Sequence, residues 1–170
     1  MIMSPAVRKL ALTAHVTCSM GWVGAVLVFL ALAVLGLHSG DAATVRGVYL
    51  VMEPAAWWTL LPLAFASLGT GLVQALGTTW GLFRHYWVLF KLSIAVFLTI
   101  VLLIYMETFR LMASAAADRV VELDAVRNAS PLLHAVLALL TLMVAVVLAI
   151  YKPRGMTRYG WRKQHEAGDE

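Results

Sequence analysis

WGLFRHYWVLFKL, residues 80–92, is a short interruption between two long apolar runs, and the rest of the chain can be arranged around it. It combines Arg84, His85 and Lys91 with two tryptophans, a tyrosine and two phenylalanines. Tryptophan and tyrosine rings are enriched at membrane–water interfaces, and basic side chains there reach the lipid phosphates. The stretch therefore predicts a tight turn at one surface of a membrane, between two spanning helices.

The composition of the chain requires an apolar solvent. Hydrophobic residues make up 62% of the 170 residues and charged residues only 13%, far from the average of soluble domains. The formal net charge is +4. Because the basic residues flank the apolar runs, we expect anionic lipid headgroups as partners, and no nucleic acid. A single cysteine, Cys18, excludes an intramolecular disulfide.

Four apolar runs predict four spanning helices, since about 20 apolar residues cross a bilayer. Residues 1–170 then form a single membrane domain, an all-α integral membrane four-helix bundle. The first run is longer than a span needs, so this helix is expected to tilt or protrude. We expect the helices at about residues 6–37, 55–79, 86–108 and 131–151.

The segment between the first two helices, residues 38–56, is more polar than its neighbours. Within it, Val45, Val48, Tyr49 and Met52 recur at helical spacing. This pattern indicates a short amphipathic helix lying in the membrane interface, with an irregular loop as the alternative.

The distribution of basic residues predicts the orientation. With both termini in the cytoplasm, nine Lys and Arg residues lie inside and four outside, in agreement with the positive-inside rule. The cytoplasmic tail, residues 152–170, is basic and carries Tyr159 and Trp161. We interpret it as an anchor to anionic lipid headgroups.

The second helix carries a stripe of small and polar residues that should face the interior of the bundle. An amide or hydroxyl in a membrane needs a partner away from water. Gln74 is therefore expected to meet a neighbouring helix. The stripe consists of Ser67, Thr70, Gly71, Gln74 and Thr78.

Four of the five histidines lie near helix ends. His15 and His85 are placed near the inner surface, and His38 and His134 near the outer surface. Neutral imidazole is the usual axial ligand of haem, and two histidines at one level could hold one iron. His15 lies within an apolar run, where an unpartnered imidazole is costly. The alternative is that each histidine is an interfacial residue bonded to water or backbone.

Two further residues could belong to a site. Cys18 follows His15 by three residues on the same helix face, and a thiolate beside imidazole could bind copper. Packing of a small apolar side chain is the alternative for Cys18. Lys91 either extends to the inner surface or provides a counter-charge for a haem propionate or an anionic substrate.

Two stretches resemble known membrane proteins. AHVTCSMGWVG, residues 14–24, resembles the first-helix pattern of copper resistance protein D and its relatives, a histidine followed by Trp-x-Gly. HYWVLFKL, residues 85–92, resembles a Trp-to-Lys helix start in the same superfamily, which includes the haem-binding membrane protoporphyrinogen oxidase of bacteria. The whole chain, including YKPRG at 151–155, is similar to a group of small actinobacterial four-helix membrane proteins.

This resemblance implies a location in the bacterial plasma (inner) membrane and a haem or copper ligand. At the position late in the third helix where it leads us to expect another histidine, this chain has Tyr105, which argues against an outer haem. The residues that the resemblance carries over are His15, Trp22, Gly24, Trp87 and Lys91.

Three functional hypotheses follow. The first is a b-type haem or porphyrin protein with a redox role, with His15, His85, His134 and Lys91 at the cofactor. The second is a copper-handling membrane protein that uses His15 and Cys18. The third is a non-catalytic partner subunit or stabiliser, associated with another membrane protein or with itself. The sequence contains no phosphate loop, zinc-type spacing or nucleophile elbow, so no catalytic residue is assigned and an enzyme is not favoured.

Overall fold

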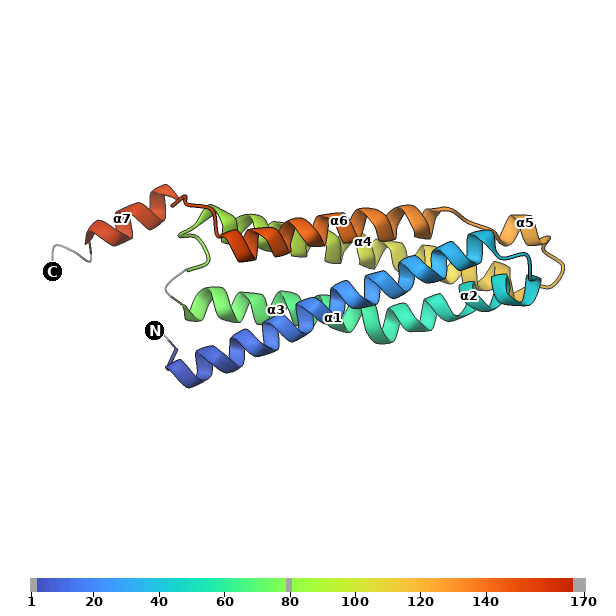
Figure 1. Cartoon of the computed structure of the whole chain (residues 1–170), viewed down its shortest axis with the longest axis horizontal. Helices are drawn as coiled ribbons and strands as arrows, with labels where there is room; N and C mark the ends of the chain where they lie inside the picture. The colour runs from blue at the N-terminus through green and yellow to red at the C-terminus, as the bar shows by residue number, and fades with distance from the viewer. Residues whose placement is uncertain (1–2, 79–80, 167–170) are drawn as a thin grey trace.

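Four long helical rods lie side by side along one axis in the computed structural model, which describes residues 3–78 and 81–166 (Figure 1). Each rod is long and apolar enough to cross a membrane, and the two termini lie at the same end of the bundle. The expected all-α four-helix architecture is confirmed. The helices are α1 Pro5–His38, α2 Ala42–Ala55, the π-helix η1 Ala56–Leu60, α3 Leu61–Gly77, α4 Tyr86–Ala117, α5 Leu123–Val126, α6 Ser130–Tyr151 and α7 Arg158–Glu166.

The rods enclose a common axis. α1 packs against α3 and α6, and α4 packs against the same two helices from the other side. At the end far from the termini, α2 takes the place of α3 and packs against α1 and α4. Trp80, the first residue of the turn stretch, lies outside the described residues.

The predicted polar segment at residues 38–56 is mostly helix. Asp41 caps α2, because its carboxylate accepts hydrogen bonds from the backbone N–H groups of Ala43 and Thr44 and from the Thr44 hydroxyl. α2 then continues through η1 into α3 as one rod. The helix that contains the second predicted span therefore begins at Ala42, 13 residues before the expected residue 55.

The apolar face of α2 is buried in protein rather than in lipid. Val45, Tyr49 and Met52 are completely buried, and Val48 nearly so. Gly36 of α1 permits this approach, since a Cβ there would lie 3.1 Å from Val48 and 3.2 Å from the Tyr49 ring. The interface-helix interpretation is wrong, because the spacing that suits a lipid surface suits two neighbouring helices equally well.

Pro54 lies inside the α2–η1–α3 rod instead of opening it. Proline provides no N–H for the helical ladder, and the five-residue π-helix η1 follows directly. Two adjacent tryptophans of η1, Trp57 and Trp58, project away from the bundle and are 55% and 84% exposed.

Two arginines close the end of the bundle far from the termini. Arg46 donates hydrogen bonds to the backbone carbonyl of Ala116 in the last turn of α4 and to those of Asp118 and Val121 in the turn that follows. Arg127 donates to the carbonyls of Leu37 and Ser39 at the end of α1. These bonds satisfy carbonyl groups that helix ends leave unpaired.

Candidate functional site: a basic cavity near the termini

A cavity of about 710 Å³ lies among α1, α3, α4 and α6, in the half of the bundle nearest the termini. Each of the four helices contributes apolar side chains to its wall, among them Trp22 of α1, Trp87 of α4 and Leu142 of α6. A polar stripe from α3 runs along one side. The cavity is therefore apolar along most of its wall and polar along one strip.

His15 lies at the centre of the polar strip. Its Nδ1 is 3.2 Å from the Thr70 hydroxyl oxygen, and its Nε2 is 3.5 Å from Lys91 Nζ. The Thr70 hydroxyl donates to the Ala66 carbonyl, so its oxygen accepts from His15 Nδ1–H. The Lys91 ammonium can only donate. His15 is therefore the Nδ1–H tautomer, with the Nε2 lone pair directed at Lys91.

The predicted stripe on the second spanning helix faces inward, as expected. The Ser67 hydroxyl of α3 lies 2.8 Å from the Ser19 hydroxyl of α1, one turn beyond the His15–Thr70 contact. Gln74 and Thr78 continue the stripe and line the cavity toward the end of α3. The polar groups of α1 and α3 thus form one row within the bundle.

The charges at the cavity are all of one sign. Arg8 and Lys9 contribute from the start of α1, Lys91 from α4 and Lys152 from the end of α6. None of the described residues lining the cavity is Asp or Glu. Because the walls are apolar, the attraction of these four cations for an anion is screened less than it would be in water.

A C-terminal strap, residues 155–160, is bonded to the turn that precedes α4. The Thr157 hydroxyl donates to the Phe83 carbonyl at 2.5 Å, and the Thr157 N–H donates to the Arg84 carbonyl at 3.0 Å. Gly160 lies against the same carbonyl, and a Cβ there would overlap it. The strap therefore joins the near ends of α4 and α6.

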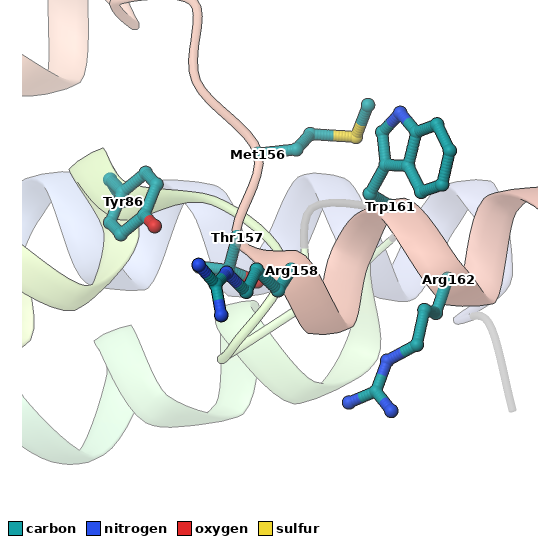
Figure 2. Close-up of a pocket in the computed structure, with 6 residues that line it drawn as sticks. All are labelled: Tyr86, Met156, Thr157, Arg158, Trp161 and Arg162. Atoms are coloured by element: carbon teal, nitrogen blue, oxygen red, sulfur yellow. The ribbon is translucent and has the colours of Figure 1, made fainter.

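Figure 2 shows a second, open pocket at the strap. Tyr86 and Trp161 lie on opposite sides of Thr157, and Arg158 and Arg162 extend from successive turns of α7. α7 itself projects beyond the end of the bundle (Figure 1). The interpretation of this tail as a lipid anchor stays a prediction.

The structure does not gather the predicted histidines in one place. Of the described histidines, His15 alone lines the cavity. His85 precedes α4 and pairs with Met156 of the strap. His134 lies in α6, stacked on Tyr105 with ring centroids 4.1 Å apart. A haem in the cavity would thus have one histidine ligand from the described chain.

Cys18, the residue suggested for copper, does not line the cavity. His38 bonds to the backbone carbonyl of Val34, and His134 bonds to that of Ser130, as the interfacial alternative predicts. In residues 3–78 and 81–166 no group of three or more His, Cys, Asp and Glu residues could hold a metal ion. Of the residues suggested for a cofactor, His15 and Lys91 lie together, with Nε2 and Nζ 3.5 Å apart.

Sequence reasoning missed three cavity residues, Arg8, Lys9 and Lys152. Their position next to apolar runs indicated contacts with lipid phosphates, and the same position is where a cavity between helix ends opens. The strap contacts of Thr157 and Gly160 were also missed. The sequence signal for the strap is Thr157, because a threonine directly before a short helix can cap it. The Thr157 hydroxyl caps α7 by accepting a hydrogen bond from the Gly160 N–H.

Comparison with known proteins identifies no relative: the chain matches no protein-family model, no curated protein and no solved structure.

Proposed function

We propose that the protein is a multi-pass protein of the bacterial plasma membrane that binds an acidic amphiphile in the basic cavity, with b-type haem or porphyrin as the specific ligand. The observation that carries the proposal is the combination of apolar walls with four cations and no carboxylate lining the described cavity. A porphyrin is a flat apolar ring with carboxylates on one edge, so it matches both parts of that lining.

The cavity residues fit a haem in two respects. The Nδ1–H of His15 is bonded to Thr70, which leaves Nε2 as the nitrogen that can ligate a metal and fixes the ring orientation. Lys91, Arg8 and Lys9 provide cations for the carboxylates. Bound haem would supply one-electron chemistry, and the chain would set its orientation and its access to water.

The orientation and the lipid contacts belong to the same proposal. We place both termini in the cytoplasm, which puts the cavity residues Arg8, Lys9 and Lys152 and the basic tail toward the cytoplasmic surface. Anionic headgroups would then face Arg158 and Arg162 of the open pocket. The excess of inner Lys and Arg residues supports this orientation.

Two other hypotheses remain distinct from this one. A non-catalytic partner subunit or homo-oligomer needs no ligand in the cavity. Copper handling needs a donor beside His15, and Cys18 lies outside the cavity lining.

The test uses protein expressed with ample haem and purified in mild detergent. The wild type and His134→Ala should show a Soret band, and His15→Ala should lose it, because His134 is a half-buried histidine outside the cavity. Metal-free porphyrin, followed by its fluorescence, should bind His15→Ala but should bind Lys91→Met more weakly. A wild type that binds neither haem nor porphyrin would overturn the proposal and leave the partner-subunit hypothesis.

A further inference from the structure

We infer that Trp57 and Trp58 lie in the lipid headgroup layer on the side of the membrane opposite to the termini, and that the bundle beyond them stands outside the bilayer. We call that part the distal lobe: α2, the ends of α1 and α4 beyond Phe29 and Met106, and α5. This inference concerns the surface that contacts lipid and does not depend on the ligand of the cavity.

The lengths of the helices require some part of the bundle to protrude. α1 has 34 residues and is about 51 Å long at about 1.5 Å per residue. The hydrocarbon layer is only about 30 Å thick. α6 has 22 residues, or about 33 Å, and is the one rod whose length matches that layer. The far end of α6 therefore marks where the bilayer should end.

The contacts between rods place the two tryptophans at this far end. α1 meets the α2–η1–α3 rod at His15–Thr70 and Gly21–Leu63, and this antiparallel register brings Trp58 level with Leu27. Two residues later, Phe29 contacts Phe109 of α4, with ring centroids 5.5 Å apart.

The start of α6 lies at the same level. The Tyr105 hydroxyl donates to the Ser130 hydroxyl at 2.8 Å, and Tyr105 contacts Phe109. The tryptophans, Tyr105 and the first turn of α6 thus share one level of the bundle. Aromatic side chains with a polar group are typical of the headgroup layer.

The pattern of charge agrees with this placement. The 21 residues from Trp58 to Thr78, about 30 Å of helix, include no Asp, Glu, Lys or Arg. On α4 the first charges after Lys91 are Glu107 and Arg110, which form an ion pair with side chains 58% and 62% exposed. An exposed ion pair is tolerated in water and is costly in hydrocarbon.

The distal lobe has a buried core of its own. Tyr49 and Met52 of α2 are completely buried against α1 and α4, and Ala116 is 2% exposed. Arg46 and Arg127 pair with backbone carbonyls at its end. These contacts hold the lobe together from within the protein.

The experiment compares pairs of exposed apolar residues on two rods. In a Cys18→Ser background, single cysteines replace Leu50 and Leu111 in the distal lobe, and Phe65 and Phe97 in the proposed hydrocarbon layer. All four side chains are between 43% and 60% exposed, so protein packing does not distinguish them. The protein is placed in liposomes made leaky by a pore-forming peptide, and a charged maleimide is added to both sides.

We expect Leu50→Cys and Leu111→Cys to react as fast as they do in detergent, and Phe65→Cys and Phe97→Cys to be strongly protected in lipid. Labelling in detergent provides the reference for each variant and shows that it folds and is reactive. Protection of Leu50→Cys or Leu111→Cys in lipid would overturn the inference, because the bilayer would then cover the lobe. Rapid labelling of Phe65→Cys or Phe97→Cys in lipid would also overturn it.

Discussion

The hydroxyl of Tyr49 is the sharpest test of how α2 is packed. The side chain is completely buried. Its hydroxyl donates to the Asn128 carbonyl at 3.1 Å and accepts from the Asn128 N–H at 2.9 Å. Tyr49→Phe keeps the ring and removes only this oxygen. It therefore leaves a backbone N–H and a backbone carbonyl of the loop before α6 without their partner.

Leaving buried polar groups unpaired costs about 1–3 kcal/mol. In a domain of this size each kcal/mol lowers the melting temperature by about 2–4 °C. We therefore expect Tyr49→Phe to melt about 2–12 °C below the wild type, measured by circular dichroism in detergent.

The control is Tyr151→Phe, since the Tyr151 side chain is 78% exposed and should tolerate the same chemical change. Equal melting temperatures for Tyr49→Phe and the wild type would refute the reasoning. They would mean that α2 does not dock on Asn128, and that the helix lies at the membrane surface, as its amphipathic spacing also allows.

Two further predictions concern the two ends of the bundle. The hydrogen bonds from the Thr44 hydroxyl and from backbone N–H groups hold the pKa of the Asp41 carboxyl below its usual value. The ionised carboxylate therefore contributes stability above the unfolded pKa of about 3.9, and this contribution is lost as the pH falls through the folded pKa. The melting temperature of the wild type should consequently fall more steeply on acidification than that of Asp41→Asn, and parallel curves would contradict this. Gly160→Val should release the strap, because a Cβ at residue 160 would overlap the Arg84 carbonyl. Trypsin should then cut after Arg158 faster than it does in the control Gly155→Ala, whose added Cβ makes only ordinary contacts. Equal cleavage rates in the two variants would show that the strap is not held there.

The spanning helices could be predicted from the sequence because their signal is a property of single segments. A run of apolar residues crosses a bilayer whatever its neighbours are. The inward orientation of the α3 stripe could also be predicted from one segment, since its polar residues recur at helical spacing and need partners inside the bundle. His15 stood out for the same reason, as a polar side chain within an apolar run.

The role of α2 could not be derived in this way. Val45, Val48, Tyr49 and Met52 define an apolar face, and a face does not say whether lipid or protein covers it. The answer depends on Gly36, which lets the Tyr49 ring approach α1. Such a pairing of distant residues leaves no trace in local spacing.

The cavity escaped prediction for a related reason. Lys91 and His15 were both singled out, but their distance depends on the register between α1 and α4. Lys152 was assigned to the lipid surface because its neighbours in sequence are polar. Only the arrangement of the helix ends shows that these cations line one space.

The asymmetric packing of the bundle limits what can pass through it. The cavity lies in the half of the bundle nearest the termini, and toward the far end the helices bury side chains that include Leu98, Thr99 and Met106. A molecule held at His15 would therefore have to separate these buried side chains to reach the far end of the bundle. The bundle thus has the construction of a receptacle in one half of its length, and not of a channel that runs from one end to the other.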